Sequence, residues 1–215
     1  MRAHEILKED AVPTVSFKQL YHVGSLDTSL KREHSYEGAG LSVSTHPDAW
    51  REIGRGAVVG DTYIATKSTN KFLDAHKLNK SAKTAIADWA VERGLIEPKE
   101  TVRVSWFDDE MDNTMYQEFS SMDAAEDEFG DLDGYEVSRN TKGYLPTDRL
   151  KKLSKNPNMS ATGVLDYVLP IYAEAQGYDG VWWQDKLDVS RYSAPRGVIV
   201  PSKLSTWDFQ QQNTA

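Results

Sequence analysis

The sequence predicts a mixed α+β domain, and two observations support this class. Candidate strands and helices follow one another without the regular strand–helix–strand alternation of a doubly wound parallel sheet. Six Trp, ten Tyr and six Phe among 215 residues are enough bulky side chains to fill one core. A chain of this length fits one large domain. We therefore expect a single domain over 1–215, with residues 1–16 as an N-terminal arm.

The first half of the chain is predicted to form strands over 18–23, 41–45 and 57–66, and helices over 47–53 and 81–93. The segment LSVST at 41–45 alternates apolar and polar side chains, as a half-buried strand does. Thr45 is placed to cap the short helix that follows it. Ser81 opens the second helix and Gly94 ends it, which is the usual order of a hydroxyl cap and a terminal glycine.

The second half is predicted to form strands over 101–107, 179–183 and 197–200, and helices over 123–129 and 161–176. In the strand TVRVSWF, the apolar residues Val102, Val104 and Trp106 alternate with polar ones, so one face should be buried. Gly130 ends the first helix. Pro170 is expected to kink the second helix, which Gly177 then ends.

The balance of charges indicates the kind of partner. The chain carries 25 Lys and Arg against 33 Asp and Glu, a net charge of −8, and a field of that sign repels a phosphate backbone. We therefore expect a protein rather than a nucleic acid as a macromolecular partner. Much of the acid lies between Asp108 and Asp133, a stretch typical of a solvated helix face with its loops. The alternative is an acidic surface that meets a basic partner or imitates nucleic acid.

Several kinds of site are excluded by residues that the chain lacks. Without Cys there is no disulfide, no thiolate zinc site and no cysteine nucleophile, and the cytoplasm is the expected compartment (that of a host cell, if a phage encodes the chain). No P-loop, G-x-G-x-x-G, H-E-x-x-H or G-x-S-x-G motif occurs. The acidic residues lack the spacing of an EF-hand loop, so no metal is expected. No run approaches the ~18 apolar residues of a membrane span.

Three parts of the chain combine residues that could hold a nucleotide: LYHVGS at 20–25, GAGLSVSTHPDAW at 38–50, and GYDGVWW at 177–183 with PRGVIVPSKL at 195–204. His22 ends a strand just before Gly24, and a His in that place can hydrogen-bond a ribose hydroxyl or a phosphate. Ser44 and Thr45 precede a helix N-terminus, which is a natural seat for a phosphate or ribose oxygen.

Aromatic side chains near these segments could stack on a flat heterocycle, and the candidates are Tyr63, Trp182 and Trp183. Because successive residues of a strand point to opposite faces, one Trp of the pair should lie in the core and the other should face solvent, a partner or a ligand. We select Trp183 as the one that binds a cofactor.

In order and character, these segments resemble the ADP-ribosyltransferase superfamily. That family has a YHGT-like first strand, a strand–helix unit of the form G-L-[YF]-[FVS]-[ST]-x-x-P-x-x-A, and late G-[YF]-D-G and E-Y-V-V-F-D-P-x-Q-I strands. The resemblance implies split, curved antiparallel β-sheets with peripheral helices, and NAD bound in the cleft as the cofactor. It also implies transfer of ADP-ribose from NAD to a macromolecular acceptor.

The resemblance gives roles to single residues. His22 would contact the adenosine ribose, with Gly24 in the turn beside it. Ser44 and Thr45 would support the nicotinamide ribose and the geometry of the cleft. Tyr63 would lie near the nicotinamide.

The chain departs from the family at the catalytic position. The family's catalytic Glu orients the ribose 2′-hydroxyl and stabilises an oxocarbenium-like transition state, and the match of GVIVPSKL to the family's last strand puts Arg196 in its place. An Arg cannot accept that hydrogen bond or offset a developing cation. A substitute carboxylate would come from Asp179, Asp185 or Asp188, and we select Asp185 because it follows the Trp pair at the strand end. Arg196 could instead clamp a diphosphate.

Different functions therefore stay open. One is an NAD-binding transferase that uses a relocated carboxylate, with His22 in both the binding and the catalytic set. The second is a non-catalytic acidic binding module on the same fold, an inhibitor or accessory protein of the kind that phages encode. The missing Glu and the net charge of −8 favour the second, whereas His22 and the Ser44–Thr45 unit favour the first. A third is an unrelated α+β domain.

Overall fold

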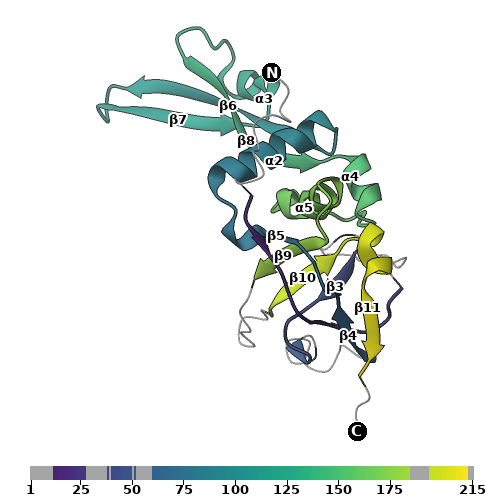
Figure 1. Ribbon diagram of the computed structural model, residues 1–215. Coiled ribbons are helices and arrows are strands. Elements are labelled where there is room, and N and C mark those ends of the chain that lie inside the picture. Colours follow the sequence, from purple (N-terminus) through teal and green to yellow (C-terminus); the bar gives the residue numbers. More distant parts are fainter. Residues whose placement is uncertain are drawn as a thin grey trace. The chain divides into compact units, whose positions relative to one another are not determined.

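The computed structural model (Figure 1) describes residues 12–27, 38, 40–49, 51, 60–184 and 194–212. Its contacts divide the chain into two compact units. Unit 1 comprises Met1–Leu95 and Pro146–Ala215, and unit 2 is the inserted segment Ile96–Leu145. The sequence predicted one domain over 1–215 and gave no sign of this division. The predicted mixed α and β class is confirmed, since both units contain helices and antiparallel strands.

Unit 1 contains two β-sheets. The larger has five strands in the order β1 (Thr14–Val15), β5 (Phe72–Asp74), β9 (Gly180–Gln184), β10 (Arg196–Ile199) and β3 (Leu41–Val43). The smaller has three strands in the order β11 (Asp208–Gln211), β4 (Thr62–Thr66) and β2 (Leu20–Val23). All neighbouring strands of these sheets are antiparallel except β5 and β9, which are parallel.

Two expectations for these sheets need correction. Purely antiparallel pairing is wrong at β5 and β9, because the long connection between them supplies the crossover that parallel neighbours need. The predicted N-terminal arm over 1–16 includes residues 14–15, which form β1 and pair with β5. Residues 1–11 of the predicted arm lie outside the described residues.

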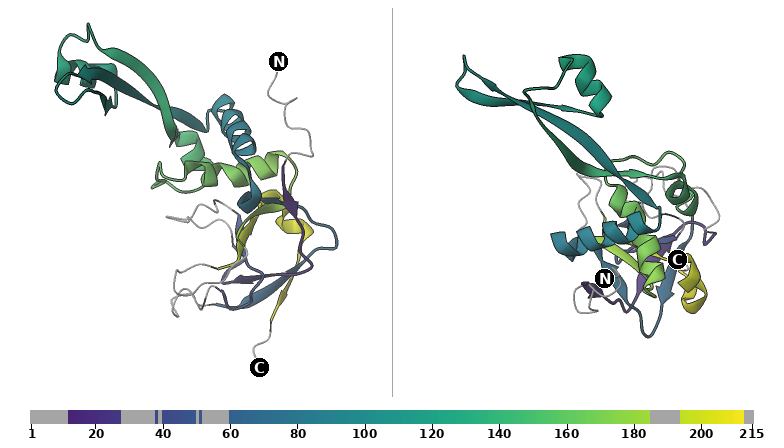
Figure 2. Two further views of the ribbon diagram at one scale, coloured as in Figure 1. Left: turned by 90° about the vertical axis from the view of Figure 1, so that its left-hand side faces the viewer. Right: turned by 90° about the horizontal axis from the view of Figure 1, so that it is seen from above.

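The two sheets of unit 1 face each other (Figure 2), and residues of both form its core. Its buried residues are Leu20, Val43, Ala65, Phe72, Trp182, Ile199 and Trp207. Phe17 packs into this cluster, and its ring centroid lies 4.4 Å from that of Trp182 and 5.3 Å from that of Phe72. The predicted split of the Trp pair is confirmed for Trp182, which is 1% exposed and belongs to this core.

Two strand glycines make this packing possible. A Cβ atom at Gly180 would lie 2.6 Å from the Phe72 ring, and a Cβ at Gly197 would lie 2.6 Å from the carbonyl oxygen of Val181 and against the Trp182 ring. Both distances are shorter than a Cβ atom in a protein allows, so any larger residue would force the strands apart. The G-x-W and R-G-V patterns of β9 and β10 therefore have a packing role.

Helices cover unit 1 at α2 (Lys80–Glu92), α4 (Asp148–Leu153) and α5 (Val164–Ala175), with short 3₁₀ turns at η3 (Ala75–Lys77) and η5 (Pro201–Thr206). The cap of α2 is Asn79, whose side-chain oxygen accepts a hydrogen bond from the Ala82 N–H at 2.8 Å, so the helix begins before the predicted Ser81. Trp89 of α2 packs edge-on against Tyr172 of α5, with ring centroids 5.1 Å apart.

Unit 2 is a three-stranded antiparallel sheet with one helix on one face. Its strands have the order β7 (Asn113–Phe119), β6 (Ile96–Asp108) and β8 (Glu136–Pro146), and the helix is α3 (Met122–Phe129). Val102, Val104 and Ala125 form its buried centre, around which the partly buried side chains Phe119, Met122, Phe129, Leu132 and Tyr135 pack.

The sequence predicted only part of unit 2. The helix over 123–129 is confirmed to within a residue; Ser121 caps it by accepting a hydrogen bond from the Ala124 N–H at 3.1 Å, and Gly130 follows it. The strand over 101–107 is confirmed as part of the longer β6. The interpretation of 108–133 as helix and loops is wrong at β7, because NTMYQEF has no apolar alternation and is held by its pairing with β6.

None of the helices among the described residues is long and apolar enough to cross a bilayer.

Candidate functional site

The segments that the resemblance singles out lie on neighbouring strands. β9, β10 and β3 are consecutive in the five-stranded sheet. β2 belongs to the other sheet but is joined to the chain just after β3 by a bridge, in which Tyr21 and Ser44 exchange backbone hydrogen bonds of 2.7 and 2.8 Å. Segments from both ends of the chain therefore meet where the two sheets touch, and we take this place as the candidate site.

His22 and Tyr63 lie side by side on neighbouring strands. They are direct partners in the β2–β4 ladder, and their ring centroids lie 6.4 Å apart. Leu20 and Ala65, two residues further along the same strands, belong to the core. Because side chains alternate along a strand, His22 and Tyr63 lie on this core-facing side of the smaller sheet. His22 is 4% exposed and Tyr63 is half-buried.

Both ring nitrogens of His22 lie within hydrogen-bonding distance of the backbone. Nδ1 is 2.7 Å from the carbonyl oxygen of Ser42, and Nε2 is 2.9 Å from that of Ser25. A neutral imidazole has one N–H and donates to one of these oxygens, whereas an imidazolium donates to both. His22 thus ties β2 to β3 and to the turn at Ser25, and a ribose hydroxyl would have to replace one of these carbonyl oxygens at the ring.

The backbone conformation at position 24 explains why a glycine is found there. Its φ angle is +113°, a conformation that favours glycine, and its N–H donates to the carbonyl oxygen of Asp61 at 2.9 Å. Gly60, with φ +122°, lies against it, and a Cβ on Gly60 would be 2.9 Å from the Gly24 Cα. The two glycines let the chains at the ends of β2 and β4 come close together.

Ser44 and Thr45 differ in how much of each side chain is exposed. Ser44 is fully buried, and its Oγ accepts a hydrogen bond from the His46 N–H at 3.1 Å, so it caps the turn that follows β3. Thr45 is exposed. Of the predicted helix over 47–53, residues 50, 52 and 53 lie outside the described residues. Pro47 and Asp48 form a turn, and Ala49 and Arg51 are helical.

Arg51 is a residue of this site that sequence reasoning missed. Its guanidinium donates to the Thr62 hydroxyl at 2.7 Å and to the Gly60 carbonyl oxygen at 2.6 Å, and it pairs with Asp48 at 3.1 Å. It thus places a positive charge at the start of β4, one residue from Tyr63. A single Arg in a short predicted helix carries no signal in the sequence, because its partners are fixed only by the fold.

Arg196 and Trp183 lie on the other side of the five-stranded sheet. Ile199 of β10 is in the core, so alternation along the strand puts Arg196 on the side away from it. Arg196 is the partner of Gln184, and Trp183 is the extra residue of the bulge between the Arg196 and Gly197 pairings. Burial lowers the pKa of the Arg196 guanidinium.

Trp183 lies near Asp166 of helix α5. Burial raises the pKa of the Asp166 carboxyl above its ordinary value of 3.8, and the neighbouring Trp183 side chain opposes that rise. The bulge accounts for this contact, because it re-aims the side chain of the extra residue. Its assignment as a cofactor-binding residue stays a prediction.

Asp179 has a structural role in the fold. Its carboxylate accepts a hydrogen bond from the Lys71 N–H at 2.8 Å and pairs with the Lys67 ammonium, and it is 6% exposed. Its backbone also bonds to Lys71 and to Val200. Asp179 therefore fastens the connection after β4 to the start of β9, and catalysis by this carboxylate would require breaking these bonds. Asp185 and Asp188 lie outside the described residues.

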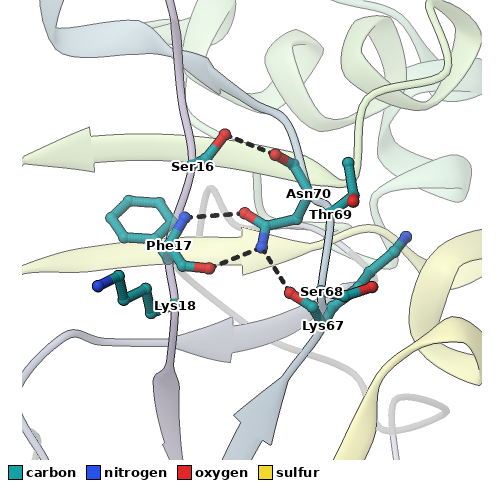
Figure 3. A pocket seen from close by; sticks show the side chains of 7 residues that line it. All are labelled: Ser16, Phe17, Lys18, Lys67, Ser68, Thr69 and Asn70. Atoms are coloured by element: carbon teal, nitrogen blue, oxygen red, sulfur yellow. Dashed lines mark hydrogen bonds between the residues drawn. The ribbon is translucent and has the colours of Figure 1, made fainter.

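A hollow of about 410 Å³ lies elsewhere in unit 1, and none of the predicted site residues lines it. It is formed by the connection from β1 to β2 and the connection from β4 to β5, as Figure 3 shows. The Asn70 side chain holds the two together, accepting from the Phe17 N–H at 2.9 Å and donating to the Phe17 carbonyl oxygen at 2.7 Å. Asn70 thereby takes the place of a strand partner for Phe17.

Comparison with protein-family models, with curated proteins and with solved structures gave no match. Within the described parts of the chain, no group of three or more His, Asp or Glu side chains is placed to hold a metal ion.

Proposed function

We propose that this chain binds NAD where its two sheets meet and acts as an ADP-ribosyltransferase-like protein on a macromolecular acceptor. The observation that carries the proposal is the adjacency of the four resembling segments. β9, β10 and β3 are hydrogen-bonded neighbours, and the Tyr21–Ser44 bridge adds β2. The sequence order of these segments does not require this adjacency, but a shared NAD cleft does.

The chemistry of the site suits a dinucleotide. Tyr63 offers a half-buried aromatic face for a base or for nicotinamide. Arg51 and Arg196 bring positive charges to the two sides of the site, and guanidinium groups bind diphosphates well because they donate several hydrogen bonds in one plane. Arg196 is the first residue of β10 and lies on the other side of the sheet, so the proposal requires a ligand that passes around this strand end from Tyr63 to Arg196.

The acid that transfer requires would be Asp185. Asp179 is occupied by Lys67 and Lys71, which removes it as the simplest choice. Asp185 directly follows Gln184, the strand partner of Arg196. A carboxylate attached at that point of the chain would be next to the position where the family has its catalytic Glu.

The proposal is tested by calorimetric titration of the full chain with NAD, paired with an assay for nicotinamide release. Arg196→Ala should weaken NAD binding by ~1.5–3 kcal/mol, the scale of a charge-assisted hydrogen bond, whereas Arg139→Ala, an exposed Arg of β8, should leave it unchanged. Asp185→Asn should abolish release and leave NAD affinity intact. A chain that does not bind NAD would overturn the proposal, and full release by Asp185→Asn would remove Asp185 from it.

A second candidate function is a non-catalytic acidic binding module, and one observation favours it. Unit 2 holds 14 Asp and Glu against 4 Lys and Arg, a net charge of −10, whereas unit 1 holds 19 against 21, a net charge of +2. The acidity of the chain therefore resides in the insert, where it could bind a basic partner with no role for NAD. Binding of NAD without nicotinamide release would leave this candidate in place.

A further inference from the structure

The edge strand β7 of unit 2 is open for pairing. β7 is at one end of the strand order and β8 at the other, so each has one side without a strand neighbour among the described residues. Proteins protect such edges with charged residues or Pro. β8 carries Glu136, Arg139, Lys142 and Pro146, whereas β7 carries one charge, Glu118. The β7 edge therefore lacks the protection that the β8 edge has.

The only charge on β7 is already neutralised. Glu118 pairs with Arg103 at 3.0 Å and with Lys142. These two cations hold the pKa of the Glu118 carboxyl below its ordinary value of 4.5. The first five residues of β7, Asn113 to Gln117, are uncharged, and among the described residues the cation against them is Arg103, which lies over the Tyr116 ring at 4.4 Å and pairs with Glu118.

One face of the sheet next to this edge exposes aromatic side chains. Val102 and Val104 alternate onto the face that α3 covers, so their neighbours Ser105 and Phe107 lie on the opposite face. Tyr116 is the strand partner of Ser105 and shares that face. Phe107 is 59% exposed and Tyr116 is 60% exposed, although soluble proteins usually bury such rings.

The charge around this face selects the chemistry of an occupant. The β6–β7 turn adds Asp108, Asp109, Glu110 and Asp112, together with Met111, which is 66% exposed. Of the carboxylates in unit 2, Glu118 alone forms an ion pair with another described residue. Unit 2 has a net charge of −10. It therefore repels a second copy of itself and also repels a nucleic acid. A cationic segment is attracted.

We propose that the β7 edge binds an extended, basic segment of another protein as an added strand. Backbone hydrogen bonds to β7 supply the pairing, as in other cases of strand addition. Every second side chain of the added segment packs toward Phe107 and Tyr116, and its Lys or Arg residues lie near the carboxylates of the β6–β7 turn. This inference does not depend on NAD binding.

The test uses the full chain and a panel of fluorescent synthetic peptides of 7 residues, the length of β7. In one set, Lys or Arg alternates with varied apolar residues; in a matched set, Glu replaces the basic residues. Anisotropy should show binding only in the basic set, and binding should weaken as salt rises from about 0.05 to 0.5 M because the attraction is screened. N-methylation of alternate peptide amides should abolish it, because strand addition needs those N–H groups.

Two variants locate the bound peptide. Tyr116→Ser should weaken binding by about tenfold or more, the effect of losing a central aromatic contact, whereas Val137→Ser, an exposed apolar residue of β8, should have no effect. Hydrogen exchange should slow at 113–119 in the complex, which reports the site even if a variant folds poorly. The proposal is overturned if no basic peptide binds, if N-methylated peptides bind equally well, or if sedimentation shows that β7 mediates pairing of two copies of the chain.

Discussion

The five-stranded sheet of unit 1 and the three-stranded sheet of unit 2 differ in how many of their faces are buried. Along β9 and β10, Gly180, Val181, Trp182 and the residues from Gly197 to Ile199 are all buried, with the core on one side and α5 on the other. Along β6, buried Val102 and Val104 alternate with exposed or half-buried residues up to Phe107. One sheet is an interior layer, and the other has an open face.

This difference explains where the charge of the chain is. A sheet that is covered on both faces has few positions for unpaired carboxylates, because a buried charge needs a partner. Asp179 follows this rule with Lys67 as its partner. Unit 2 has an open face, an open edge and exposed turns, and it carries the excess of 10 negative charges. We infer that the two units have different tasks, with ligand binding in unit 1 and partner binding in unit 2.

The largest loss of stability is expected at β9, where substitutions on its two faces should have different effects. Trp182→Ala should lower the free energy of unfolding by ~3–5 kcal/mol, because it empties the centre of the core between the sheets. Trp183→Ala should cost clearly less, since Trp183 is only half-buried. Chemical denaturation of the two variants compares them. Equal losses would contradict the placement of Trp182 and Trp183 on different faces.

The next largest loss of stability is expected at a glycine whose surroundings leave no room for a Cβ atom, compared with a glycine that has free space around it. Gly180→Ala should destabilise unit 1 by ~3 kcal/mol, because its Cβ would collide with Phe72 and with the backbone of Val198. Gly143→Ala in β8 meets nothing within 4 Å, and its φ of +87° should cost only about 1 kcal/mol. The order of the two denaturation midpoints is the readout. A reversed order would mean that β9 is not packed as described.

Asp179 should prove structural rather than catalytic. Asp179→Asn removes the charge that Lys67 and the Lys71 N–H bind, and it should cost ~1.5–3 kcal/mol of stability, as expected for a buried hydrogen bond to a charged group. Lys67→Met is the matched control for the other half of the pair and should cost a similar amount. If Asp179→Asn stays fully stable yet loses nicotinamide release, the carboxylate belongs to catalysis after all.

The smallest effect is a pair of opposite pH dependences. The pKa of Asp166 is raised by burial, so its contribution to stability is present below its ordinary value of 3.8 and is lost as pH rises through the folded-state value. Asp166→Asn should therefore stabilise the chain at neutral pH and change little at about pH 3. The pKa of Glu118 is lowered by Lys142 and Arg103, so its contribution is present above 4.5 and lost on acidification. Glu118→Gln should destabilise the chain at neutral pH only. Denaturation curves across this range give both signs, and equal signs would contradict the contrast between the units.

The elements that the sequence predicted correctly are those whose caps and stop residues lie within the element or next to it. The helix over 123–129 has its cap at Ser121 and its stop at Gly130. The cap of α2 was placed two residues late, at Ser81 instead of Asn79, because both are good caps. The pairing of β5 with β9 and the insertion of unit 2 were missed, because both depend on contacts between distant parts of the chain. For the same reason the hydrogen bond between Asp179 and Lys71, 108 residues apart, could not be predicted.

The sequence named residues that the fold connects, but their roles stay predictions. The β2–β4 ladder pairs His22 with Tyr63, and the bridge from Tyr21 to Ser44 joins β2 to the chain after β3. Trp183 and Arg196 lie on the other side of the sheet. The bulge at Trp183 explains the direction of its side chain, and the sequence gives no sign of the bulge because its cause is the register between β9 and β10.

The most direct test of the central claim is hydrogen exchange of the full chain with and without saturating NAD, read by mass spectrometry at peptide resolution. We predict that NAD slows exchange in β2, in the turn after β3 and at the start of β10, and leaves β7 of unit 2 unchanged. Slower exchange confined to 16–18 and 67–70, the connections that line the hollow, would place the ligand elsewhere. No change anywhere in the chain would contradict the NAD site itself.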